Sequence, residues 1–224
     1  MKYQAGQRVY IIDDDALVRE SLATLLKVRE YEVDTYSSAG EFLITDLKSA
    51  RGCLLLDLKM PDVGGLDLQK CLMSRGCALP VVFISGVGTV SSCVRALKCG
   101  ALNFLSKPVA ANDLFSAVEE AFVFDERADR ERSQSKEIAR RFSLLSERER
   151  IVVKSVVCGR LNKQIAGDLE VSERMVKIYR ANAMQKLATN NVAQLAEVLR
   201  QVTQLSYRDS LHFVEGAPLP VGLR

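Results

Sequence analysis

Carboxylates gather at two places in the first half of the sequence. Asp13, Asp14 and Asp15 stand side by side after the apolar run 9–12, and Asp57 closes a second apolar run. Crowded carboxylates repel one another and resist losing water, so a bound cation would offset the cost of placing them there. Mg²⁺ prefers oxygen ligands of this kind. The alternative is that one aspartate caps the following helix while the others face water.

Two further polar side chains end apolar runs in the same way. Ser85 follows "VVFI", and Lys107 lies in "NFLSKP". A carboxylate such as Asp57 can attack a phosphoryl group when a metal ion and an ammonium neutralise the developing charge. Lys107 supplies the ammonium, and Ser85 offers a hydrogen bond to a phosphoryl oxygen. Alone, each of these residues is an ordinary surface or capping residue. Together they predict a phosphoryl-transfer site.

The elements that must position these groups alternate regularly along the chain. Short apolar runs predict strands at 9–12, 31–36, 53–58, 80–85 and 101–106, and helical periods occupy 16–28, 38–48, 64–75, 89–99 and 112 onward. This order predicts an α/β doubly wound fold of the (βα)5 type with a parallel sheet. Ligands of such folds lie beyond the carboxyl ends of the strands. The four polar groups should therefore meet in one crevice.

The second half of the sequence is helical. We expect residues 1–123 to form the first domain and 124–142 a charged helical linker, because 124–137 continues without Gly, Pro or regular apolar spacing. The pattern predicts four helices within residues 143–204. Pro and Gly residues near the end of the sequence predict an irregular tail over 205–224. Asn112 is the expected N-cap of the helix that leads into the linker. Ser146 and Glu149 form a predicted capping box.

Two of these helices, separated by a very short turn, predict a helix-turn-helix for double-stranded DNA. A helix over 173–187, opened by Ser172, would bury one face and present a basic face outward. Arg174, Lys177, Ile178 and Ala181 could reach base edges in the major groove, and Asn162, Lys163, Arg180, Asn182 and Lys186 could hold phosphates. A merely solvated basic helix is the alternative.

Charge and composition agree with two different partners. Residues 1–121 carry 13 basic and 15 acidic side chains, whereas 143–203 carry 10 and 6, which favours a polyanion for the second region. No apolar run reaches the ~20 residues of a membrane span, and the N-terminus lacks a signal-peptide core, so we expect a cytoplasmic protein without a membrane partner. The six cysteines show no metal-binding spacing, and we expect reduced thiols. A single histidine leaves little material for histidine-based catalysis.

The four motifs around Asp13, Asp57, Ser85 and Lys107 resemble, in order and spacing, the receiver domain of two-component response regulators over residues 7–123. The resemblance implies that Asp57 is the phosphoacceptor of a sensor histidine kinase. It also implies a Mg²⁺ site in which Asp14 binds directly, Asp13 binds through water, and Asp57 and the backbone carbonyl of Lys59 contribute oxygens. Ser85 and Phe104 would be the switch residues. Asp15 is left as the N-cap of the first helix.

The segment "LSERER…GRLNKQIAGDLEVSERMVKIYRANAMQKL" is similar to the DNA-binding domain of NarL, LuxR and FixJ regulators. Met175 and Tyr179 depart from the threonine and histidine usual there. The resemblance implies a transcriptional regulator that acts on RNA polymerase, forms a homodimer on phosphorylation and activates transcription.

Two rival interpretations remain at this point. An aspartyl phosphatase would need a second acid two residues after the nucleophile, where this chain has Lys59, so we expect no enzyme activity beyond the protein's own phosphoryl transfer and dephosphorylation. The other rival is a receiver that serves only as a constitutive dimerisation module.

Overall fold

The chain folds into two compact units. The computed structural model describes residues 8–45, 50–86 and 90–215, and the units divide between Asp129 and Arg130. Each unit has its own hydrophobic core, and helix α5 (Ala111–Ser143) contributes residues to both units.

The first unit is built on a parallel five-stranded sheet in the order β2-β1-β3-β4-β5. The strands are β1 (Arg8–Ile12), β2 (Glu32–Tyr36), β3 (Cys53–Asp57), β4 (Val81–Ser85) and β5 (Asn103–Ser106). Every residue of β3 and β4 is buried, as expected for central strands covered on both faces. The doubly wound (βα)5 prediction is confirmed.

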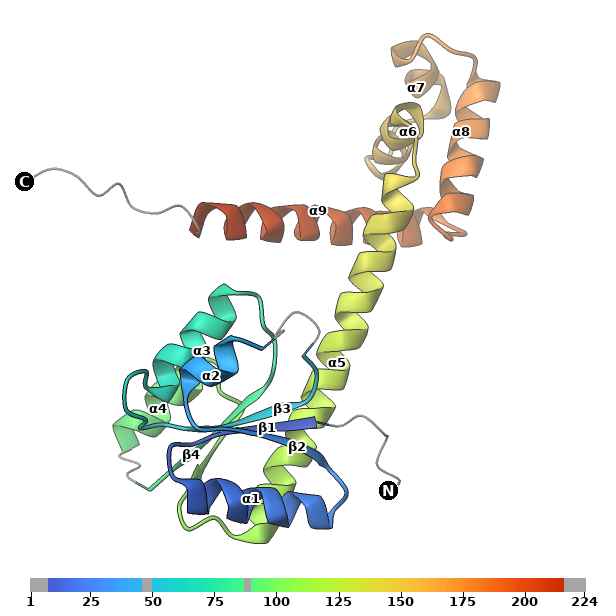
Figure 1. The fold of residues 1–224 in the computed structure, drawn as a ribbon. Helices are drawn as coiled ribbons and strands as arrows, with labels where there is room; N and C mark the ends of the chain where they lie inside the picture. Colours follow the sequence, from blue (N-terminus) through green and yellow to red (C-terminus); the bar gives the residue numbers. More distant parts are fainter. Residues whose placement is uncertain (1–7, 46–49, 87–89, 216–224) are drawn as a thin grey trace, which may run out of the picture. The chain divides into compact units, whose positions relative to one another are not determined.

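Helices cover both faces of this sheet (Figure 1). The helices α1 (Ala16–Val28) and α5 pack on one face, and α2 (Ala39–Leu43), α3 (Gly65–Ser74) and α4 (Val90–Lys98) pack on the other. Alternate residues of each central strand enter the two cores, so that Leu55 packs under α1 and α5 while Leu54 and Leu56 pack under α2 and α3.

Two predicted helix boundaries in this unit are wrong. Helix α2 ends at Leu43, well before residue 48, because the Thr45 hydroxyl and amide both bond the Phe42 carbonyl and close the last turn; residues 46–49 lie outside the described ranges. Helix α5 starts at Ala111, because the Leu114 amide already bonds the Ala110 carbonyl, so Asn112 lies inside the helix and is not its N-cap.

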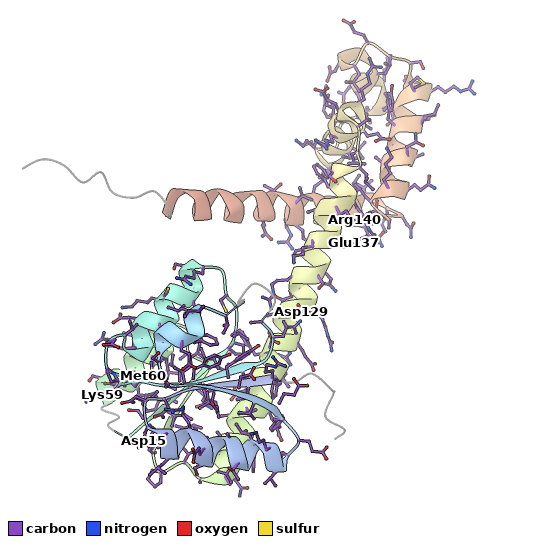
Figure 2. The ribbon with its side chains drawn as sticks, viewed as in Figure 1. Asp15, Lys59, Met60, Asp129, Glu137 and Arg140 are labelled. Atoms are coloured by element: carbon purple, nitrogen blue, oxygen red, sulfur yellow. The ribbon has the colours of Figure 1, made fainter. Side chains whose placement is uncertain are left out.

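A buried ion pair extends the first unit past residue 123. The Asp125 carboxylate, 5% exposed, accepts hydrogen bonds from Arg51 Nε at 2.8 Å and from the Gly52 amide at 3.1 Å. Arg51 also pairs with Asp129, which Figure 2 shows on α5. Gly52 has a φ of +124°, and a Cβ there would collide with the Arg8 carbonyl, so only glycine allows this approach. These contacts tie α5 to the sheet as far as Asp129.

In its described residues, the second unit consists of helices joined by short turns and contains no strand. It contains the end of α5, α6 (Glu147–Val157), α7 (Asn162–Asp168), α8 (Glu173–Lys186) and α9 (Val192–Glu215). The capping box of Ser146 and Glu149 and the N-cap Ser172 are confirmed. Its core contains Val152, Val153, Ile165, Val176 and Ala183 at nearly zero exposure.

The predicted irregular tail is wrong for its first half. Helix α9 continues to Glu215, because no Gly or Pro interrupts the sequence before Gly216; residues 216–224 lie outside the described ranges. Each of the six cysteines is a free thiol. Among the described residues, no helix combines the length and hydrophobicity needed to span a bilayer.

Candidate functional site

Lys107 joins two buried carboxylates at the carboxyl edge of the sheet. Its ammonium lies 2.6 Å from Asp13 Oδ2 and 2.9 Å from Asp57 Oδ1, and the two carboxylates are 2% and 6% exposed. Asp13 follows β1, Asp57 ends β3 and Lys107 follows β5, so the three groups come from strands 1, 3 and 5. The predicted convergence of these groups is therefore present in the structure.

Asp57 is held as an oriented, weakly hydrated carboxylate. Its Oδ2 accepts the Lys59 amide at 2.7 Å, and its Oδ1 faces the ammonium of Lys107. Burial raises the pKa of Asp57, Lys107 opposes the rise, and the nearby charge of Asp13 adds to it. A carboxylate that has lost part of its water shell and is fixed by two donors is pre-positioned to act as a nucleophile.

Lys107 remains a cation in this setting. Burial alone would lower its pKa, but the carboxylates of Asp13 and Asp57 outweigh burial and the pKa rises. Its backbone amide donates to the Ser85 carbonyl at 2.9 Å, which joins β5 to β4 at this edge. The lysine therefore provides a permanent positive charge beside the Asp57 carboxylate.

Ser85 and Phe104 both belong to this part of the sheet. Ser85 ends β4 and is 2% exposed, and Phe104 lies on β5, half-buried against the core beneath α2, α3 and α4. Gly65 permits the close approach of α3, since a Cβ there would collide with the backbone carbonyl of Asp57. The switch roles of Ser85 and Phe104 stay predictions.

The three consecutive aspartates take different positions. Asp13 turns inward, and its Oδ1 also accepts the Asp15 amide at 3.0 Å. Asp14 is exposed, and Asp15 is the N-cap of α1, accepting the Leu17 amide at 2.9 Å. The expected capping role of Asp15 is thus confirmed. Figure 2 shows Asp15 and Lys59 at the same end of the sheet.

The oxygens around Asp57 fit a hard divalent cation better than a soft one. Among the described residues, no cluster of three or more His, Cys, Asp or Glu side chains is close enough to hold a metal ion. Mg²⁺, however, commonly uses only one or two carboxylates and fills its remaining positions with water and phosphate oxygens. The buried carboxylates of Asp13 and Asp57, with exposed Asp14 beside them, satisfy that lower requirement.

The predicted base-reading side chains share the exposed face of α8. Arg174, Lys177, Ile178 and Ala181 are all exposed, whereas Val176 and Ala183 on the opposite face are fully buried. Within the described part of the chain, no acidic side chain pairs with Arg174 or Lys177. The turn between α7 and α8 spans only residues 169–172. This geometry is that of a helix-turn-helix with an outward-facing second helix.

The predicted phosphate contacts divide into two groups. Asn182 and Lys163 are exposed, and Asn162 and Arg180 are partly exposed. Lys186 instead has a structural partner: its ammonium lies 2.7 Å from the buried carboxylate of Glu149 and 3.2 Å from the Leu144 carbonyl. Sequence reasoning missed this pair, because the capping box explained Glu149 without a partner on α8.

The fold and the two sites together are those of a response regulator: a receiver unit followed by a helix-turn-helix unit. Comparison with known proteins agrees. Residues 9–119 match the family model "Response regulator receiver domain", and residues 143–199 match "Bacterial regulatory proteins, luxR family". The chain belongs to the family of two-component response regulators with a LuxR-type DNA-binding domain.

The alignments with similar proteins extend over most of this chain and most of each relative. The chain is 37% identical to the response regulator protein TodT of Pseudomonas putida, over 87% of this chain and 86% of that protein. It is 40% identical to the transcriptional regulatory protein FixJ of Azorhizobium caulinodans, over 86% and 90%. Among solved structures, the response regulator StyR superposes with a TM-score of 0.78 at 36% identity, over 88% of this chain and 100% of that one.

Proposed function

We propose that the protein is a cytoplasmic transcriptional activator that a sensor histidine kinase switches on by phosphorylating Asp57. The observation that carries the proposal is the position of the Lys107 ammonium, which lies within 3 Å of both buried carboxylates, Asp13 and Asp57. A paired lysine of this kind can neutralise charge that develops on a phosphoryl group at Asp57. The basic face of α8 in the same chain then binds DNA, which is how the phosphorylated protein would act on transcription.

In the proposed reaction, a carboxylate oxygen of Asp57 attacks phosphorus while the bond from phosphorus to the histidine nitrogen of the kinase breaks. The Lys59 amide holds the other carboxylate oxygen by a hydrogen bond, and the ammonium of Lys107 contacts the phosphoryl oxygens as they arrive at Asp57. Ser85 and Phe104 then reposition and change the face formed by α4 and β5. When bound through Asp13, Asp14, Asp57 and the Lys59 carbonyl, Mg²⁺ supplies further neutralisation of negative charge.

The phosphorylated receivers pair as a homodimer in this proposal, and two copies of α8 read half-sites related by a two-fold axis. The bound dimer then recruits RNA polymerase. For a near-complete switch, phosphorylation must change the free-energy difference between unpaired and paired receivers by about 5 kcal/mol.

Phosphorylation is tested with acetyl phosphate and Mg²⁺, followed by intact mass spectrometry. We expect a gain of one phosphoryl group in the native chain and none in Asp57→Asn. Asp62→Asn, which alters an exposed aspartate in the loop that follows β3, is the matched control and should behave as the native chain. A phosphoryl group retained by Asp57→Asn would overturn the assignment of the phosphoacceptor.

The switch is tested by selecting bound DNA from a random duplex library with and without beryllium fluoride, which mimics a phosphoryl group on Asp57. Enrichment of an inverted repeat only with the mimic supports the proposed switch. Equal enrichment without it would show that the receiver is a constitutive dimerisation module, the rival interpretation.

A further inference from the structure

A side chain outside the predicted DNA-binding set lies beside α8. Arg148, in the first turn of α6, is exposed, and its Nη1 donates a hydrogen bond to the Tyr179 hydroxyl at 3.2 Å. Tyr179 belongs to α8 and follows Ile178, which is 41% exposed on the outward face. The hydroxyl therefore holds a guanidinium from α6 next to the helix that is to enter the groove.

The helical periodicity of α8 locates this pair more closely. Successive residues of an α-helix are about 100° apart. With buried Val176 and Ala183 facing inward, Tyr179 and Lys186 lie on one common flank of α8, and Asn182 lies between that flank and the outward face. Arg148 and Glu149 of α6 contact this flank through Tyr179 and Lys186 respectively.

The two basic groups on this flank are not equivalent. Lys186 is engaged by the buried carboxylate of Glu149, so its charge is locally compensated. Arg148 has a neutral phenol as its partner, so its full positive charge is retained at an exposed position. The acidic side chains adjacent to Arg148 are Glu147 and Glu149, and each projects about 100° away around α6; Glu149 is paired with Lys186.

We propose that Arg148 is a DNA phosphate contact and that Tyr179 is its positioning residue. A helix lying in the major groove has a sugar-phosphate backbone along each flank, and a guanidinium held there is suited to two phosphate oxygens. The tyrosine hydroxyl reduces the number of conformations that the arginine loses on binding. This inference rests on the proposed insertion of α8 into the major groove.

The test measures DNA affinity by fluorescence anisotropy over a series of salt concentrations, using the full chain and the duplex enriched in the selection. The matched control is Arg200→Ala, which removes the same charge from an exposed arginine of α9 that is paired with Glu197. For Arg148→Ala we expect roughly tenfold weaker binding, the lower end for a charge-assisted hydrogen bond. The slope of log K against log salt should fall by about 0.9, and equally for non-specific DNA. Arg200→Ala should leave the slope unchanged.

Tyr179→Phe keeps the ring and the arginine but removes the hydroxyl. We expect about threefold weaker binding with an unchanged salt slope, and no additional effect of Tyr179→Phe in an Arg148→Ala background. Arg148→Gln repeats the charge loss with a longer polar side chain, in case Arg148→Ala lowers the melting temperature.

The possible failures are distinguishable. If Lys177→Ala abolishes sequence preference while Arg148→Ala and Arg200→Ala behave alike, the groove insertion stands and the Arg148 contact is overturned. If additive effects of Tyr179→Phe and Arg148→Ala are measured, the positioning role of Tyr179 is overturned. If the native chain selects no DNA at all, the proposed function itself fails.

Discussion

The buried carboxylate of Asp125 offers a sharp test of what holds α5 to the receiver unit. Replacing it with alanine leaves the buried Gly52 amide without its acceptor, at a cost of about 1–3 kcal/mol. Arg51 keeps its second partner, Asp129, and is 37% exposed, so the lost ion pair adds only about 0–1 kcal/mol. Alanine returns roughly 0.5 kcal/mol through its higher helix propensity. These contributions sum to about 0.5–3.5 kcal/mol, and we expect a net loss near the middle of that range, about 2 kcal/mol, in the free energy of unfolding.

This loss is measured by hydrogen exchange and mass spectrometry on the full chain. The amides of β3 are fully buried, so their slow exchange reports unfolding of the first unit alone. Protection of a peptide covering residues 53–57 should fall roughly 30-fold in Asp125→Ala, since 1.4 kcal/mol corresponds to a factor of ten. Peptides from α8 serve as the internal reference and should keep their exchange rates.

Asp129→Ala is the matched control, because Asp129 binds the same arginine from an exposed position. It should lower protection by no more than about fivefold, as expected of a surface ion pair. Equal effects of the two substitutions would refute the reasoning, because the burial of Asp125 and its bond to the Gly52 amide would then contribute nothing.

Three further predictions concern the two sites. Asp57→Asn should raise the stability of the fold at pH 7, because burial raises the pKa of Asp57 and its ionised form therefore destabilises the native state above that raised pKa. The gain in stability should vanish as pH falls toward the ordinary value of 3.8. Thermal melts at several pH values would contradict this prediction if the gain grew at low pH. Gly65→Ala should cost about 1–3 kcal/mol by urea denaturation, because its Cβ would collide with the Asp57 carbonyl. Gly40→Ala has ordinary space within helix α2, so it should be neutral or slightly stabilising, since alanine favours a helix over glycine. Glu149→Gln should lower the free energy of unfolding by roughly 1–3 kcal/mol at pH 7. Burial opposes ionisation of Glu149, but Lys186 and the Ser146 amide outweigh burial and lower its pKa. The ionised carboxylate therefore stabilises the fold above the ordinary pKa of 4.5, and this stabilisation is lost as pH falls through the lowered pKa. Equal pH profiles for Glu149→Gln and the native chain would count against that last prediction.

The sequence by itself determined the succession of strands and helices along the chain, because apolar periodicity and capping residues act locally. It also placed Asp13, Asp57, Ser85 and Lys107 at the ends of their strands, and a parallel sheet brings such ends to one edge whatever the loops do. The capping roles of Asp15 and Ser146 were predictable for the same reason, since a cap bonds only amides two or three residues away.

The tertiary structure alone decided the contacts between groups that are distant in sequence. No local pattern relates Arg51 to Asp125, Arg148 to Tyr179 or Glu149 to Lys186, and these pairs depend on how whole helices pack. It also decided which of three adjacent aspartates turns inward, because only Asp13 meets the ammonium of Lys107. A buried charge is stabilised by its three-dimensional neighbours, and those neighbours come together only when the chain has folded.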